Sequence, residues 1–160
     1  MDEHAAQIRR LMLSITRMDG AYYYFARTLG YKENLLFLLY ALGDGRPHSQ
    51  AEICRDWLIP KTTVNTNVKE LVAGGYITLA QGDGTREKMM TLTDSGRAYA
   101  EKLLGRVYQA EQAALEQTLA QFSAGFVDAM EYFAQCLCQE FERRTSCVSP
   151  GGSEKEKECI

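Results

Sequence analysis

The sequence predicts a mainly α-helical protein with a small β-wing, a winged helix-turn-helix flanked by further helices at both ends. Three observations predict this fold class. Apolar residues recur at helical spacing near both ends of the chain, proline and glycine delimit short helices in the middle, and the period then changes to alternation over residues 76–80 and 88–92. A chain of 160 residues that is 46% hydrophobic suits one globular domain, or a small module with an oligomerisation element.

The chain opens with an amphipathic segment that predicts a helix over residues 5–29, ended by Gly30. Its apolar positions, at i, i+3, i+4 and i+7, are Ile8, Leu11, Met12 and Ile15. The next helix, over residues 33–42, is apolar on nearly every face, which is typical of a buried central helix. The Gly-Asp-Gly sequence at 43–45 ends it.

Two short helices follow. Ser49 and Glu52 have the spacing of a capping box, which predicts a third helix that starts at Ser49 and ends near Trp57. Pro60 precedes residues 61–73 and two glycines follow them, so these residues form the predicted fourth helix.

After the fourth helix, turn residues at 81–84 join the two alternating segments into a predicted β-hairpin with an exposed tip. Two long amphipathic helices are expected over residues 93–120 and 123–143. From Thr145 onward the composition favours disorder. The predicted organisation is an N-terminal helix over 1–30, a winged helix-turn-helix over 31–93, C-terminal helices over 94–143 and a disordered tail over 144–160.

The fourth helix has an apolar and a polar face when each residue is advanced by about 100°. The predicted buried residues are Val64, Val68, Leu71 and Val72. The predicted outward stripe is Thr62, Asn65, Thr66 and Lys69. Short polar side chains let a helix approach base edges, and Asn and Thr suit adenine edges and the thymine methyl. Five Thr and Asn residues in this helix, Asn67 among them, lower its helix propensity without a packing reason, which favours a role in reading DNA. The alternative interpretation is an ordinary face that contacts only solvent.

The predicted hairpin carries cations beside its turn. Arg86 and Lys88 can reach a phosphate or the adjacent minor groove from there. In the alternative interpretation, Arg86 only pairs with Asp83 or Glu87 in a solvated loop. The net charge of −3 gives no independent indication of nucleic-acid binding.

The stretch from Ser49 to Leu104 resembles the winged helix-turn-helix of the MarR family of bacterial transcriptional regulators. Two segments carry the resemblance, IPKTTVNTNVKELVAGGYI and LTDSGRAYAEKL, and the whole resemblance covers about residues 5–142. It implies that the terminal helices build a homodimer. It also implies a transcriptional regulator, expected to be a repressor, that binds a pseudo-palindromic operator in double-stranded DNA.

By the same resemblance, the residues that face bases or phosphates are Thr62, Asn65, Thr66 and Lys69, with Lys61 and Thr63 near the backbone and Ser49 and Gln50 on phosphate. Two departures remove positive charge. The family's wing often carries Asp-x-Arg-x-x-Arg, of which only Asp83 and Arg86 remain, and the family often has arginine where Thr66 stands. We therefore expect moderate affinity and a shallow dependence on salt.

The resemblance also implies a small effector, often phenolic or lipophilic, in a cleft between the dimer helices and the winged domain. The candidate residues are Tyr22, Tyr23, Tyr24, Phe25 and Tyr31, since aromatic walls with hydroxyl tips suit such ligands. Core packing is the alternative use of these rings.

The five cysteines form no CxxC pair, so we expect reduced thiols. Cys54 falls in a predicted buried helix, Cys136 and Cys138 point to different sides of the last helix, and the tail holds Cys147 and Cys159. Some MarR regulators sense oxidants through cysteine, but no cationic neighbourhood favours this here. The only histidines, His4 and His48, have no partner at metal-ligand spacing, so neither a metal nor another cofactor is expected.

Other function classes find less support. Phosphate loops, serine elbows and catalytic carboxylate motifs are absent from the sequence, which predicts no enzyme. The longest apolar run, residues 35–42, is far below the ~18–20 residues of a membrane span, and the first residues do not have the pattern of a secretory leader. We therefore expect a cytoplasmic protein. A winged-helix adaptor that binds protein is the main alternative, but the outward stripe lacks the apolar anchor expected of it.

Overall fold

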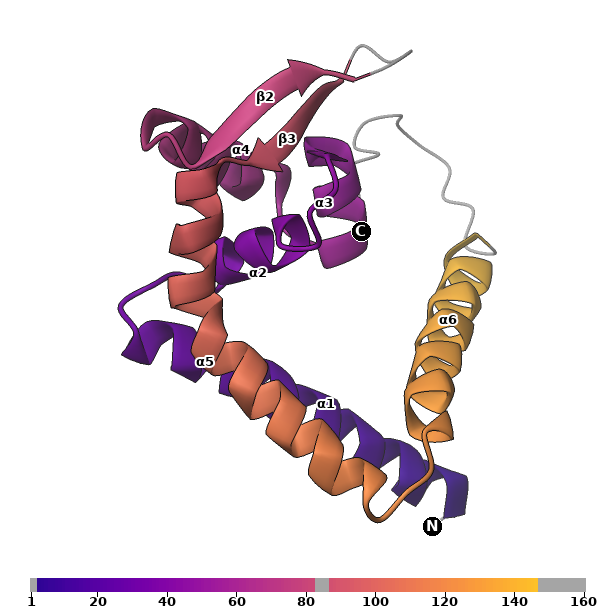
Figure 1. Ribbon diagram of the computed structural model, residues 1–160. Coiled ribbons are helices and arrows are strands. Elements are labelled where there is room, and N and C mark those ends of the chain that lie inside the picture. Colours follow the sequence, from indigo (N-terminus) through magenta and orange to yellow (C-terminus); the bar gives the residue numbers. More distant parts are fainter. Residues whose placement is uncertain (1–2, 83–86, 147–160) are drawn as a thin grey trace. The chain divides into compact units, whose positions relative to one another are not determined.

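The computed structural model describes residues 3–82 and 87–146, and Figure 1 labels their helices and strands. The helices are α1 (Glu3–Thr28), α2 (Glu33–Leu42), α3 (Gln50–Trp57), α4 (Lys61–Ala73), α5 (Asp94–Leu119) and α6 (Gly125–Ser146). The strands are β1 (His48–Ser49), β2 (Ile77–Gln81) and β3 (Lys88–Leu92). The predicted fold class, mainly α with a small β-wing, is confirmed.

The largest boundary difference is at α6, which starts at Gly125 and continues to Ser146, three residues beyond the predicted end at Arg143. The Thr145 hydroxyl donates to the Phe141 carbonyl at 2.9 Å, and arginines in the last turn favour the negative end of the helix dipole. The first residues of the predicted tail are therefore helical. The rest of that tail, with Cys147 and Cys159, lies outside the described residues.

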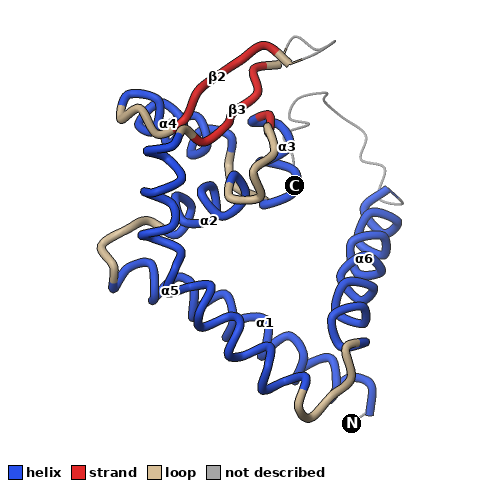
Figure 2. Tube along the Cα trace, viewed as in Figure 1, coloured by secondary structure: helices blue, strands red, loops and turns tan. Residues whose placement is uncertain are grey.

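The chain divides into two compact units, the winged-helix unit up to Gly105 and the C-terminal unit from Arg106, and α5 continues through the boundary. In the winged-helix unit the strands form an antiparallel sheet in the order β1-β3-β2 (Figure 2). Ile77 pairs with Leu92 at the base of the wing. β1 has two residues, too few to show a period, and the sequence did not predict it.

The core of the winged-helix unit forms around α2, as its apolar composition predicts. Leu36, Leu38 and Leu39 are fully buried there. Buried side chains reach this core from the surrounding elements: Ile53 from α3, Val64, Val68 and Leu71 from α4, Met90 and Leu92 from β3, and Leu103 and Leu104 from α5. Because α4 contributes three such anchors, its rotation about its own axis is fixed, and so is the face that it turns to solvent.

A close contact joins the turn after α4 to the start of α5. Gly75 has φ +72°, in the left-handed region that glycine adopts without strain. The Thr93 hydroxyl donates to the Gly75 carbonyl at 2.7 Å, and the Thr93 amide donates to the Tyr76 carbonyl at 3.0 Å. A Cβ at Gly96 would lie 1.8 Å from that same carbonyl oxygen, so no side chain fits there. The rings of Tyr76 and Tyr99 stack 4.4 Å apart beside it.

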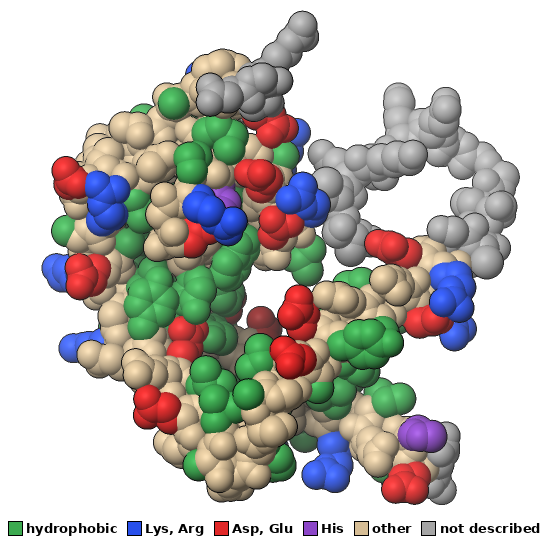
Figure 3. Space-filling model, turned by 45° about the vertical axis from the view of Figure 1, so that its right-hand side comes forward, with side chains coloured by type: hydrophobic (Ala, Val, Ile, Leu, Met, Phe, Trp, Pro, Cys, Tyr) green, Lys and Arg blue, Asp and Glu red, His purple; other side chains and the backbone are tan. Residues whose placement is uncertain are grey.

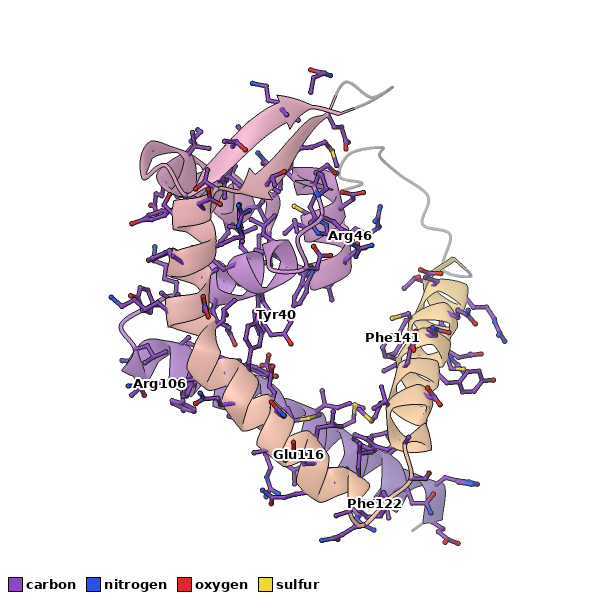
Figure 4. The ribbon with its side chains drawn as sticks, in the orientation of Figure 1. Tyr40, Arg46, Arg106, Glu116, Phe122 and Phe141 are labelled. Carbon is purple, nitrogen blue, oxygen red and sulfur yellow. The ribbon has the colours of Figure 1, made fainter. Side chains whose placement is uncertain are left out.

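The C-terminal unit exposes many large apolar side chains. Phe122, in the turn after α5, is 63% exposed, and Phe141 on α6 is 61% exposed (Figure 4). The other exposed members are Tyr108, Leu115, Leu119, Phe126, Val127 and Tyr132. Such a set exceeds the isolated apolar residues of an ordinary surface and is typical of a contact face.

Candidate nucleic-acid interface

The outward face of α4 is the polar one. Thr62, Asn65, Thr66 and Lys69 are all exposed, whereas Val64 and Val68 are buried on the opposite side. The predicted buried face is thus confirmed for Val64, Val68 and Leu71. It is wrong for Val72, which is 40% exposed because it lies at the edge of the contact with the core.

The polar groups on this face differ in how they are already bonded. The Thr66 hydroxyl donates to the Thr62 carbonyl one turn back, at 2.9 Å. Within the described part of the chain, the Asn65 side-chain amide has no hydrogen-bond partner in the protein. Asn65 therefore offers both a donor and an acceptor to solvent or to a ligand.

Asn67 lies on the core side of α4 and is only 4% exposed. Its Nδ2 atom is buried without a hydrogen-bond partner among the described residues. The prediction that Asn67 has no packing reason is wrong, since its side chain is part of the packed face. A buried, unbonded donor costs free energy, about 1–3 kcal/mol for such a group.

The N-terminus of α4 suits an anion. Pro60 is its N-cap, without a side-chain hydrogen bond to the first amides, and the first turn carries no acidic residue. Lys61 is exposed and Thr63 half-buried at this end. Unbonded amides at the positive end of a helix dipole, next to a lysine, favour a phosphate.

The two predicted phosphate contacts at the start of α3, Ser49 and Gln50, differ in their exposure to solvent. Ser49 is 2% exposed and its hydroxyl accepts from the Glu52 amide at 3.2 Å, while the Glu52 carboxylate accepts from the Ser49 amide at 2.6 Å. The predicted capping box is therefore confirmed, and it occupies the Ser49 side chain. Gln50 is half-buried, with part of its side chain open to solvent.

Leu58, in the turn between α3 and α4, is a residue that sequence reasoning missed. Its φ of 51° places it in the left-handed region, where a residue with a Cβ is disfavoured. Its side chain is also 70% exposed. The isolated leucine gave no periodic signal, so only the conformation of the turn identifies it.

The wing contributes one described cation. Lys88 is exposed at the start of β3, opposite Gln81. Asp83 and Arg86 lie outside the described residues, so the predicted roles of Arg86 stay predictions.

Charges of both signs are interspersed on the winged-helix part of the face seen in Figure 3. Arg46, which Figure 4 shows projecting from the segment after α2, pairs with Asp44 at 2.7 Å. Hydrogen bonds from His48 and from the Arg46 amide hold the pKa of Asp44 well below its usual range. Arg55 pairs with Asp56 at 2.7 Å. Local pairing of this kind leaves little net positive potential, as the near-neutral charge of the chain suggests.

A hollow of about 350 Å³ lies between the end of α1 and the start of α2, lined by Tyr23, Arg27, Tyr31, Lys32, Glu33 and Asn34. Of the predicted effector residues it therefore brings together Tyr23 and Tyr31. Tyr22 instead packs on Phe37, with ring centroids 5.5 Å apart. Tyr24 is 68% exposed, with its ring edge-on to Tyr23 at 5.3 Å, and Phe25 is half-buried.

The side chains that line the hollow include two basic residues, Arg27 and Lys32, and the carboxyl group of Glu33. Arg27 donates to the Tyr23 hydroxyl at 3.2 Å. Burial, together with the nearby charge of Asp19, raises the pKa of Glu33, and its Oε1 is buried without a hydrogen-bond partner in the described residues. Aromatic walls with Arg27 and Lys32 would suit an aromatic anion.

Among the described residues, Cys54, Cys136 and Cys138 form no disulfide. Cys54 is half-buried and not in the fully buried position expected, because α3 packs on the core mainly through Ile53. Over residues 3–82 and 87–146, no group of three or more His, Cys, Asp or Glu side chains could hold a metal ion. Within the same ranges, every helix is too short or too polar to cross a membrane.

Comparison with known proteins identifies the winged-helix segment. Residues 36–86 match the model of the MarR family, a span that runs from α2 into the wing. The resemblance seen in the sequence is thereby confirmed. No curated protein is similar enough to this chain to be matched.

Solved structures share the fold over most of the chain. A MarR family regulator from Neisseria meningitidis has a TM-score of 0.70 at 22% identity, covering 89% of this chain and 99% of that one. A MarR family regulator from Silicibacter pomeroyi DSS-3 has a TM-score of 0.65 at 20% identity, covering 81% and 93%. A protein from Listeria monocytogenes assigned to this family, in complex with a 26mer DNA, has a TM-score of 0.61 at 14% identity, covering 93% and 97%.

Proposed function

We propose that this chain, whose residues 36–86 carry the winged helix of the MarR family, is a sequence-specific transcriptional regulator that binds double-stranded DNA as a homodimer. The observation that carries the proposal is the orientation of α4. Val64, Val68 and Leu71 are buried in the core, so the stripe that α4 turns to solvent consists of short polar side chains and one lysine: Thr62, Asn65, Thr66 and Lys69. Such a face suits the major groove, which presents hydrogen-bonding edges and thymine methyl groups.

In the proposed complex α4 lies in the major groove. Asn65, Thr66 and Thr62 face bases, while Lys69, Lys61 and Thr63 contact the backbone near the helix. Gln50, Lys88 and Arg86 are proposed phosphate contacts. We leave Ser49 out of this set, because its hydroxyl is buried in the helix cap. The Listeria monocytogenes protein, which shares the fold, is in complex with a 26mer DNA, and this supports the proposal that the chain binds DNA.

The proposed homodimer follows from the apolar side chains that each unit leaves exposed. Phe122, Phe141 and Tyr132 in the C-terminal unit are more than half exposed, and α1 exposes Ile8 and Leu13 to a similar degree. A second copy would bury these side chains and would supply a second α4. Two recognition helices about one duplex turn apart would read a pseudo-palindrome, which is how we expect a cytoplasmic bacterial repressor to act.

We further propose that the hollow beside α2 binds a small aromatic anion that releases the protein from DNA. Tyr23 and Tyr31 supply ring faces, and Arg27 and Lys32 supply positive charge. The pKa of Glu33 is raised by burial, so a neutral carboxyl is easier to form there than on an exposed residue.

An adaptor that binds protein is a second candidate, because apolar side chains flank the polar face of α4. Leu58 is 70% exposed and Val72 is 40% exposed, and either could serve as an anchor for a partner protein. This candidate predicts that Leu58→Ser abolishes partner binding while Asn65→Ala has no effect.

The test is titration of the protein with the duplex upstream of its own gene, at two salt concentrations and with scrambled duplex as competitor. Saturable binding of one dimer that resists the competitor supports the proposal. Asn65→Ala is expected to weaken binding about tenfold without a change in thermal stability. Thr28→Ala, an exposed threonine on α1, is the matched control and should bind as the wild type does. Binding no tighter than to scrambled DNA in both this assay and a selection from random duplexes would contradict the proposal.

A further inference from the structure

We propose that Thr66 reads the C5-methyl group of a thymine through its own methyl group, and does not serve as a hydrogen-bond donor to a base. This inference rests on the proposed function, because it assumes that α4 lies in the major groove. It adds a base preference for one residue of the exposed face. Thr66 also stands where MarR regulators often have arginine. Because threonine carries no charge, it cannot make the contact that a positively charged arginine would make with DNA at this position.

The hydroxyl of Thr66 already has a partner. It donates to the Thr62 carbonyl at 2.9 Å, within the helix, and a hydroxyl has only one hydrogen to donate. To donate to a base it would have to give up this bond and rotate its side chain. The bond also holds the oxygen against the backbone of α4, while Thr66 as a whole remains exposed. The methyl group is therefore the part of the side chain that is available for a new contact.

This arrangement discriminates among bases. Guanine presents two acceptors, N7 and O6, in the major groove, and these need a donor that Thr66 does not offer. Thymine presents a methyl group there, which an apolar contact can recognise. Asn65 is the contrasting neighbour, since its amide has no partner in the described residues and retains both donors and an acceptor. Thr66 therefore favours an A·T pair with thymine on the strand it contacts.

The first step of the experiment selects bound sequences from random duplexes, which also tests the proposed function by itself. Each thymine of the selected site is then replaced by deoxyuridine, which removes only the C5-methyl group. We expect one symmetry-related pair of positions where this replacement weakens wild-type binding by about fourfold per half-site, the effect of one buried methyl group.

Two variants identify the contact as that of Thr66. Thr66→Val keeps a methyl group without the hydroxyl, and should retain both the affinity and the sensitivity to deoxyuridine. Thr66→Ser keeps the hydroxyl without the methyl group, and should bind the thymine site about fourfold less tightly per half-site and no longer respond to deoxyuridine at that position. Thr28→Ser is the control, because the Thr28 hydroxyl makes the same bond, to the Tyr24 carbonyl at 2.8 Å, away from α4.

The outcomes separate the two proposals. If a specific site is selected but Thr66→Ser still responds to deoxyuridine, or Thr66→Val loses the site, the inference about Thr66 is overturned and the proposed function stands. If no sequence is enriched over the random pool, both are overturned. Circular dichroism of each variant excludes loss of the fold as the cause.

Discussion

Replacing Gly96 by alanine should be among the most damaging single substitutions in the winged-helix unit. The added Cβ would lie 1.8 Å from the Tyr76 carbonyl oxygen, whereas such contacts are essentially never closer than 3.0 Å. The start of α5 must therefore move by more than about 1 Å from the turn after α4. Both contacting groups are backbone or directly attached to it, so no flexible side chain can move aside.

The cost can be worked out from the bonds at this contact. Thr93 donates to Tyr76 at 3.0 Å and to Gly75 at 2.7 Å, and Gly96 donates to the Thr93 hydroxyl at 3.0 Å. Loss of two such bonds costs roughly 2 kcal/mol, and overpacking adds about 1–3 kcal/mol. We expect Gly96→Ala to lower the free energy of unfolding by about 3–5 kcal/mol, and the melting temperature by roughly 10 °C.

The matched control is Gly105→Ala in the same helix, where a Cβ would meet no described atom within 4 Å. Alanine should raise the free energy of unfolding there by about 0.5–1 kcal/mol, because it has the higher helix propensity. The assay is urea denaturation followed by circular dichroism at a fixed protein concentration, since the proposed dimerisation would make stability depend on concentration. A Gly96→Ala protein within about 1 kcal/mol of the wild type would refute the close approach of α5 to Tyr76.

Three further predictions concern single side chains. Ser49→Ala removes the capping box of α3 and should lower the free energy of unfolding by about 1 kcal/mol in urea denaturation, whereas Gln50→Ala should have little effect. Asn67→Leu removes the unbonded buried Nδ2 and should raise the free energy of unfolding by about 1–2 kcal/mol, and the melting temperature with it. An unchanged or lower melting temperature would contradict this prediction. The pKa of Asp44 is lowered in the folded state, so its ionised form stabilises the protein fully above its usual pKa of 3.8, and this contribution is lost as pH falls below that value. The stability difference between wild type and Asp44→Asn should thus shrink as pH is lowered from about 6 to about 3, and a constant difference would argue against the contacts of Asp44 with His48 and Arg46.

The sequence predicted the helices well where their ends have local chemical causes. Pro60 and the glycines after Ala73 set the ends of α4 at the residues expected, and the capping box set the start of α3. At α6 the local signals were weaker, and the helix continues past Arg143 because Thr145 and the arginines stabilise its last turn. The two-residue strand β1 is formed by pairing with β3, which no local pattern encodes.

For the candidate site, the helical period predicted the exposed face of α4 but not the state of each side chain on that helix. Periodicity gives the angle of a residue around its own helix, and only the neighbouring elements decide how wide the buried sector is. Val72 is consequently exposed, against the expectation from the helical period, and Asn67, for which no packing reason was expected, is buried.

The order of the elements and their approximate ends could thus be predicted from the sequence, because they depend on interactions between residues close in the chain. The resemblance to a regulator family could be seen there too, because it lies in the residues themselves. The tertiary structure alone decided the burial of Ser49, the hollow formed by Tyr23 and Tyr31, and the contact of Gly96 with Tyr76. Each of these depends on the packing of one element against another. Such contacts join parts of the chain whose separation in sequence gives no local signal.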